Sequence, residues 1–150
     1  MNWLRNFPIP EYHLALLVVG LGLHLWSRTA IVFTSSPTFL VIGVLFVAAA
    51  LVISSWSVAS FGKETTVQPD TLRTDGPYKL TRNPMYLSWT LVLLGAGLIA
   101  GSWWLLAFAP LAMVATQLRI IASEEKFLLE RFGTEYKAYM ETVPRWFWPL

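Results

Sequence analysis

The sequence predicts an all-α membrane protein, and three observations indicate this fold class. Hydrophobic residues make up 55% of the chain and charged residues only 13%, roughly half the charged share of a soluble globular domain. Four long apolar stretches follow one another, each near the ~20 residues that a helix needs to cross a bilayer. The positive charges are distributed unevenly between the two ends of these stretches.

The apolar stretches predict transmembrane helices at residues 12–27, 38–61, 84–100 and 103–121. If the amino terminus is cytoplasmic, ten of the eleven lysines and arginines lie inside and only Arg28 lies outside. Cationic loops resist translocation, so both termini are expected in the cytoplasm. The 150 residues are expected to form one domain, with four transmembrane helices and a carboxyl-terminal amphipathic helix at the interface. The expected location is the cytoplasmic (inner) membrane of a prokaryote, as an integral multi-pass protein.

The first stretch has one alternative interpretation, a cleavable signal peptide. Pro8, Pro10 and Glu11 precede it, and no small-x-small cleavage site follows. These features favour a retained first helix.

The connections contain recognisable start and turn signals. A polar loop at residues 62–83 joins the second and third helices, and Asn83-Pro84 is typical of a helix start, with Asn as the capping acceptor. Gly101-Ser102 predicts a tight outer turn, and Pro110 predicts a kink in the fourth helix. If both arms of this hairpin are straight and rise ~1.5 Å per residue, Glu124 returns to about the depth of residue 79.

Beyond Arg119, apolar and aromatic residues recur every three or four positions with charges between them, which predicts an amphipathic helix along the inner membrane surface. Gly133 is expected to divide it into two pieces. The run Trp146-Phe147-Trp148 is expected to seat the tail in the interface.

Several function classes are excluded or disfavoured by composition. The chain has no cysteine, which excludes a disulfide framework, a thiolate metal site and a cysteine nucleophile. His13 and His24 are too few for a metal centre, so no metal is expected. The nine acidic residues lie on the same side as ten of the eleven basic ones, so the net charge of +2 says little about partners; no nucleic-acid partner is expected.

Two polar segments flank the hydrophobic hairpin. The first contains Gly76-Pro77-Tyr78 and Arg82-Asn83-Pro84-Met85-Tyr86; the second contains Glu124-Glu125 and continues through Phe132-Gly133, Glu135-Tyr136 and Tyr139. Two membrane passes separate them, so they can meet at one membrane face only. We expect the chemistry there.

These segments, together with Thr71-Leu72 and Val143-Pro144-Arg145, resemble the integral-membrane methyltransferases, which include isoprenylcysteine carboxyl methyltransferases and phospholipid N-methyltransferases. The resemblance covers roughly residues 60–146. It implies S-adenosyl-L-methionine as cofactor on the cytoplasmic side and a lipid or lipid-linked methyl acceptor. Two departures are Asn83, where many members have His, and Ser88, where glycine is usual.

Carried over position by position, the resemblance implies a cofactor region at about residues 62–86 and 119–146. The implied cofactor contacts are Tyr78, Arg82, Asn83, Pro84, Met85, Tyr86 and Glu124, with a weaker inference for Lys63, Asp70, Thr71, Leu72 and Arg73.

The chemistry of these residue types agrees with that assignment. The amino terminus of a helix, reinforced by Arg82, suits a carboxylate. The catalytic candidates are Glu124 and Glu125, as carboxylates for the cofactor or as a general base towards an amine, and Arg119, as an anchor for an anionic acceptor group. Tyr78 and Tyr86 offer aromatic faces for adenine or a sulfonium.

Other interpretations stay open beside these. Arg82 and the glutamates are also compatible with a structural ion-pair cluster, and Phe132, Tyr136 and Tyr139 with packing. The two histidines are compatible with function or with hydrogen bonds between helices. Gly97 and Gly101 permit a homodimer or close packing within one chain.

Two other functions compete with the methyltransferase. One is an NADPH-dependent membrane sterol or lipid reductase, whose family shares a similar carboxyl-terminal region but is longer. The other is a non-catalytic membrane adaptor.

Overall fold

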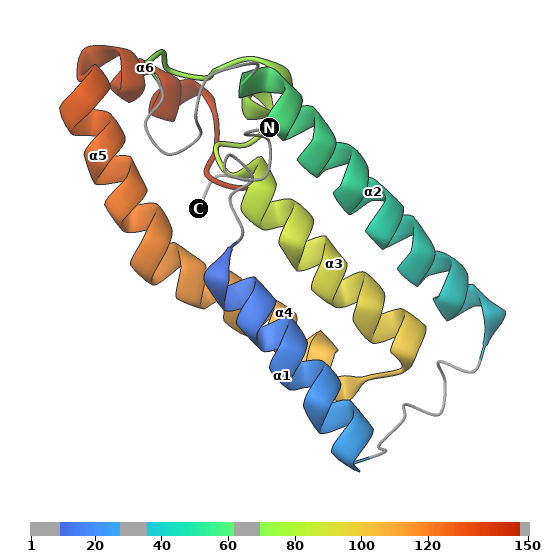
Figure 1. Cartoon of the computed structure of the whole chain (residues 1–150). Coiled ribbons are helices and arrows are strands. Elements are labelled where there is room, and N and C mark those ends of the chain that lie inside the picture. The colour runs from blue at the N-terminus through green and yellow to red at the C-terminus, as the bar shows by residue number, and fades with distance from the viewer. Residues whose placement is uncertain (1–9, 28–35, 62–69, 148–150) are drawn as a thin grey trace, which may run out of the picture.

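The computed structural model describes residues 10–27, 36–61 and 70–147, and every regular element in these ranges is helical (Figure 1). The elements are α1 (Glu11–Ser27), α2 (Pro37–Phe61), the 3₁₀ turn η3 (Gly76–Lys79), α3 (Pro84–Ala100), α4 (Trp103–Thr116), the π-helical turn η4 (Gln117–Ile121), α5 (Ala122–Phe132) and α6 (Thr134–Thr142).

The four long helices form a bundle in which sequence neighbours are not always spatial neighbours. α2 packs on α3, α3 on α4, and α4 on α1, so α1 and α2 lie on opposite sides of the α3–α4 hairpin (Figure 1). The buried centre between α3 and α4 contains Leu93, Leu105, Ala109 and Ala112. The hairpin therefore forms the core, and the polar segments lie at one of its ends.

Within the described residues, two helices are long and apolar enough to cross a membrane: Pro37–Ser60 and the continuous stretch Trp103–Phe132. α3 is apolar but has 17 residues, as does α1. The described residues thus confirm an all-helical chain with membrane-length helices, whereas the expected four spans stay a prediction.

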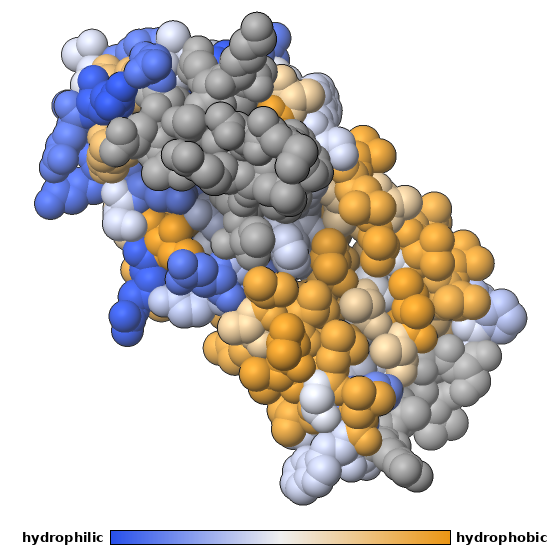
Figure 2. Space-filling model, viewed as in Figure 1, coloured by the Kyte–Doolittle hydropathy of each residue, from blue (hydrophilic) through white to orange (hydrophobic). Residues whose placement is uncertain are grey.

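The surface separates into two regions along the length of the bundle. Figure 2 shows a broad hydrophobic surface over the helices and a hydrophilic end around α5 and α6. Large apolar side chains of the helices are strongly exposed, including Leu25 (74%), Trp26 (83%), Leu51 (61%) and Leu118 (69%). Contiguous exposed apolar surface of this kind suits contact with lipid chains rather than water.

The carboxyl-terminal helix differs from the expectation. It does not start as a separate surface helix, because α4 continues through η4 into α5 without interruption. Thirty residues extend about 45 Å at ~1.5 Å per residue, more than the ~30 Å of hydrocarbon. The charged part beyond Arg119 therefore projects past the apolar section. Gly133, at φ +51°, ends α5 and separates it from α6, as predicted.

The tight turn between α3 and α4 lies at Gly101-Ser102, where the sequence predicted it. Gly101 ends α3 in the left-handed conformation (φ +62°), and the hydroxyl of Ser102 accepts a hydrogen bond from the backbone N–H of Leu105. Pro110 lies inside α4, and the helix continues through it.

Small residues bring the helices together within one chain. A Cβ atom on Gly43 of α2 would lie 2.9 Å from the carbonyl oxygen of Gly95 on α3, and a Cβ on Gly97 would lie 2.7 Å from the side chain of Leu106 on α4. Gly97 is therefore used in packing within the chain. The homodimer through Gly97 and Gly101 stays an untested prediction.

Candidate functional site

Tyr86 and Glu124 join the two polar segments. Tyr86 lies in the first turn of α3 and Glu124 in the first turn of α5, and the tyrosine hydroxyl donates a 2.7 Å hydrogen bond to Oε1 of the glutamate. This contact confirms that the segments meet at one end of the hairpin. A hairpin with two straight arms places Glu124 level with residue 79, further out than Tyr86. That geometry includes neither the π turn nor the path of α5.

Tyr78 is held beside this pair by the turn η3. Gly76, at φ +55°, starts the turn, and any Cβ there would collide with the hydroxyl of Ser60 on α2. The hydroxyl of Tyr139 donates a 2.7 Å hydrogen bond to the backbone carbonyl of Tyr78. Burial, with smaller contributions from Tyr139 and Glu124, raises the pKa of Tyr78, so this phenol is neutral at physiological pH.

Glu124 is a carboxyl group that is crowded by protein yet accessible to solvent. Burial raises its pKa above the usual glutamate range; the hydrogen bond from Tyr86 opposes this shift and the negative charge of Glu125 adds to it. Because its side chain is exposed in the isolated chain, a ligand can reach it. A raised pKa and an accessible position are features of a group that binds or exchanges protons.

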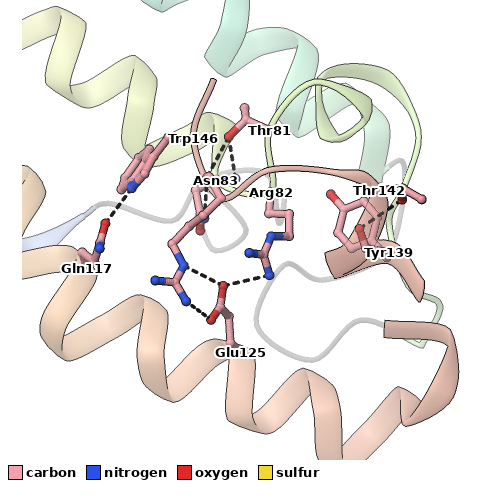
Figure 3. A network of polar contacts seen from close by, with 9 residues as sticks. Thr81, Arg82, Asn83, Gln117, Glu125, Tyr139, Thr142 and Trp146 are labelled. Atoms are coloured by element: carbon pink, nitrogen blue, oxygen red, sulfur yellow. Dashed lines mark hydrogen bonds and ion pairs between the residues drawn. The ribbon is translucent and has the colours of Figure 1, made fainter. Parts of the chain in front are cut away.

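Glu125, although adjacent in sequence, is enclosed by two arginines (Figure 3). Its Oε1 lies 3.0 Å from Arg82 and accepts a 2.9 Å hydrogen bond from Nε of Arg145, while Oε2 accepts a second bond from the same guanidinium. The side chains of Arg82 and Glu125 are only 10% and 11% exposed. Interaction with Glu125 raises the pKa of Arg145. The structural ion-pair interpretation is thus confirmed for Arg82 and Glu125.

This ion-pair cluster changes the roles expected for two residues. Both oxygens of Glu125 already accept hydrogen bonds from a guanidinium group, so its carboxylate is not free to take a proton from an acceptor. Arg82 points to Glu125 rather than standing open for a cofactor carboxylate. Of the two glutamates, Glu124 is therefore the one whose carboxyl group is accessible to a ligand.

The carboxyl-terminal tail is attached to the start of α3. The backbone N–H of Arg82 donates to the carbonyl of Pro144 (3.0 Å), and the carbonyl of Arg145 accepts from Thr81 Oγ1 (2.9 Å) and Asn83 Nδ2 (3.0 Å). α3 begins at Pro84 as predicted, but the expected side-chain cap is wrong: the amide of Asn83 holds the tail instead.

Trp146 corrects a second expectation. It is 1% exposed, packs with Tyr86 and Ile121, and donates a 2.6 Å hydrogen bond to Gln117 of the π turn. It is therefore buried inside the protein rather than lying in the interface, because the indole N–H finds an acceptor there. Phe147 is 54% exposed, and Trp148 lies outside the described residues.

The remaining expected residues are placed less centrally. Pro84 and Met85 are buried at the start of α3, whereas Thr71 is exposed and Leu72 packs on the cluster of Tyr136, Tyr139 and Val143. Asp70 is largely exposed and pairs with Arg131 at 3.2 Å, so it attaches the loop to α5. Arg73 is half-buried beyond Leu72, Arg119 is exposed on the π turn, and Lys63 lies outside the described residues.

The structure gives contacts for Ser88 and for the aromatic residues of α5 and α6. Ser88, a departure from the family pattern, donates to the carbonyl of Met85 and lies 2.6 Å from Ser54 on α2, so it joins two helices. Phe132, Tyr136 and Tyr139 pack together as the packing interpretation predicted. The sequence indicated no role for Gln117 or Thr81, and it pointed to the tail only through the run Val143-Pro144-Arg145 and the expected interfacial position of Trp146.

Residues 38–135 match the phospholipid methyltransferase family, and the chain belongs to that family. It is 32% identical over 112 residues to the cobalt-zinc-cadmium resistance protein CzcN of Cupriavidus metallidurans, a match that covers 75% of this chain and 50% of the relative. The chain therefore spans about half the length of that relative. No solved structure matches the chain.

Proposed function

We propose that this chain is an integral-membrane methyltransferase that transfers a methyl group from S-adenosyl-L-methionine to a lipid or lipid-linked acceptor. The acceptor classes are a phospholipid amine and an isoprenylcysteine carboxylate, and the reaction takes place at the cytoplasmic face. The contact between Tyr86 and Glu124 carries the proposal, because it assembles the two halves of the family motif into one site.

The charges of the site suit the amino-acid end of this cofactor, which carries one ammonium and one carboxylate. Glu124 is an accessible carboxylate without an ion-pair partner among the described residues. Next to it, Arg82 and Arg145 share one glutamate, which leaves the cluster with a net charge of +1. An ammonium at Glu124 and a carboxylate on the positive side match this distribution. The first turn of α3, which Asn83 does not cap, adds backbone amides.

Tyr78 and Tyr86 supply the aromatic surface of the site. Aromatic faces stabilise a nearby cation and stack on planar rings, so they suit the sulfonium and adenine. The cofactor supplies a methyl group that a nucleophile takes by direct displacement. The chain then has to align the two reactants and exclude water. Tyr86 is well suited to this task because it is buried between helices and fixed at its hydroxyl.

The proton of an amine acceptor requires a base, whereas a carboxylate acceptor does not. Glu124 is the candidate, because burial raises its pKa and its carboxyl group is accessible. Arg119 is exposed at the end of the apolar section, where it is available to a phosphate or carboxylate of the acceptor.

We also propose four spans with cytoplasmic termini. α1 and α3 have 17 residues each, within the lower range that crosses a bilayer, and exposed apolar residues continue along α1, α2 and α4. The distribution of positive charge supports the orientation with both termini in the cytoplasm.

The reductase and the adaptor make different demands. The dinucleotide cofactor of a nicotinamide-dependent reductase carries additional negative charge. A site built around an accessible Glu124 carboxylate repels that charge. An adaptor needs no accessible, protonation-sensitive carboxyl group. Both alternatives are separated from the proposal by measuring the reaction itself.

The test uses membranes that contain the protein, incubated with S-adenosylmethionine labelled in its methyl group. Label in the organic extract above that of membranes without the protein supports the proposal. Release of the label as methanol by mild base identifies a methyl ester, and base-stable label identifies an N-methyl group. Glu124→Gln is expected to lower incorporation and the surface variant Glu130→Gln to leave it unchanged. Equal label with and without the protein contradicts the proposal.

A further inference from the structure

His13 is a buried polar residue that the proposed chemistry does not use. It lies near the start of α1, outside the residues matched by the family, and is fully buried. Its Nε2 lies 3.0 Å from the hydroxyl of Thr90 on α3, and its Nδ1 lies 3.4 Å from the hydroxyl of Thr116 on α4. One imidazole thus connects three helices.

The hydrogen-bond network assigns a direction to these contacts. The hydroxyl of Thr90 donates its single proton to the backbone carbonyl of Tyr86 (2.9 Å). It therefore accepts from His13, which places a proton on Nε2. Nδ1 of the neutral ring is then an acceptor for Thr116. The chain of bonds runs from Thr116 through His13 and Thr90 and ends on Tyr86.

His13 also contacts the side chain of Tyr86. The two rings are stacked, with centroids 6.4 Å apart and planes 26° apart. Tyr86 further packs in a cluster with Ile121 and Trp146, and its hydroxyl ends on Glu124. The histidine therefore constrains both the backbone and the ring of the residue that meets Glu124.

We propose that His13 is a positioning residue that holds Tyr86 in the orientation in which its hydroxyl binds Glu124, so that α1 helps to build the cofactor site. The expected effect of His13 on cofactor binding rests on the proposed function. A purely apolar side chain fills the same space without needing two hydrogen-bond partners, so packing alone does not account for a fully paired imidazole.

Four variants separate positioning from packing. His13→Leu removes the ring and both hydrogen bonds, and His13→Gln restores a donor and an acceptor. Thr90→Val leaves the histidine in place but breaks its connection to Tyr86. Ser57→Ala is the control, because it removes a buried hydroxyl of α2 that bonds only within its own helix.

The first measurement is the affinity of the purified, folded protein for S-adenosylmethionine. His13→Leu and Thr90→Val are expected to raise the dissociation constant about three- to tenfold, and His13→Gln and Ser57→Ala less than about twofold. In a Glu124→Gln background, His13→Leu should have little further effect. A full-length folded His13→Leu variant with wild-type affinity overturns the inference, as does an equal loss in both backgrounds.

The second measurement needs no ligand and keeps the two proposals distinguishable. It compares the shift in thermal unfolding midpoint caused by Tyr86→Phe in the wild type and in Thr90→Val. If His13 positions Tyr86 through Thr90, the shift is smaller in the variant; equal shifts overturn the inference. If the wild type does not bind S-adenosylmethionine, the proposed function is contradicted. The comparison of unfolding midpoints still tests whether His13 positions Tyr86.

Discussion

The hydroxyl of Tyr86 donates a 2.7 Å hydrogen bond to the carboxyl group of Glu124, and this bond connects the first turn of α3 to the first turn of α5. The two residues are separated by the whole α3–α4 hairpin. Their contact gives one end of that hairpin an accessible carboxylate and an aromatic wall.

Replacing Glu124 by Gln should weaken binding of S-adenosylmethionine about five- to tenfold, because a charge-assisted hydrogen bond of roughly 1.5–3 kcal/mol becomes a neutral one of roughly 0.5–1.5 kcal/mol. The measurement is equilibrium binding to purified protein. Glu130→Gln, a change of the same type at an exposed position of α5, serves as the control and should bind like the wild type. Unchanged affinity in Glu124→Gln removes Glu124 from the site.

Glu124 also predicts how the ligand-free protein responds to pH. Its pKa is raised in the fold, so its favourable contribution to stability is fully present below the pKa of an unfolded glutamate and is lost as pH rises through the folded-state pKa. At neutral pH, Glu124→Gln should therefore unfold at a higher temperature than the wild type, and the difference should shrink in acid. A variant less stable than the wild type at neutral pH contradicts this.

Ligand binding should show the opposite pH dependence. An ammonium group selects the ionised carboxylate, so the affinity for S-adenosylmethionine should rise with pH through the raised pKa of Glu124. The same titration on Glu124→Gln should be flat in that range. A parallel slope in wild type and variant would falsify the assignment of this titration to Glu124.

Glu125 should affect stability more than its exposed neighbours. Glu125→Ala leaves two arginines facing each other in a mostly buried position, and breaking a buried pair costs about 3–5 kcal/mol. Glu130→Ala, which breaks the exposed 3.9 Å pair with Lys126, should cost less than about 1 kcal/mol. Equal unfolding midpoints for the two variants contradict the ion-pair cluster.

The α2–α3 contact should tolerate no added methyl group. Gly43→Ala places a Cβ 2.9 Å from the carbonyl oxygen of Gly95, so the helices must separate, at a cost of about 1–3 kcal/mol. Gly22→Ala on α1 meets nothing within 4 Å and should be close to neutral. Thermal unfolding in the same detergent compares them, and a neutral Gly43→Ala speaks against this close approach.

The absence of cysteine makes the topology directly measurable. A membrane-impermeant thiol reagent applied to intact cells should label Ser36→Cys, placed before α2, and should label Lys137→Cys on α6 only after permeabilisation. The reverse pattern contradicts the proposed orientation.

The sequence was sufficient to predict the parts that depend on local signals. Asn83-Pro84, Gly101-Ser102 and Gly133 are local signals for helix starts and ends, and the structure places helix ends there. A hairpin with polar ends predicted that the two polar segments meet, but it placed Glu124 level with residue 79 and did not predict the hydrogen bond to Tyr86.

The sequence could not predict that Glu124 contacts Tyr86 while Glu125 pairs with two arginines. Adjacent residues on a helix point about 100° apart, so a change of register decides which one faces Tyr86. The π turn at Gln117–Ile121 adds one residue per turn and shifts that register, and it has no clear signature in the sequence. The burial of Trp146 depends on a partner, Gln117, that is 29 positions away.

The most direct test of the site is a calorimetric titration of the purified protein with S-adenosylmethionine and, separately, with NADPH. The Tyr86–Glu124 site predicts saturable binding of S-adenosylmethionine at one site per chain, weakened in Tyr86→Phe and Glu124→Gln, and no binding of NADPH. Preference for NADPH, or no heat with either compound, contradicts a methyltransferase cofactor site at this position.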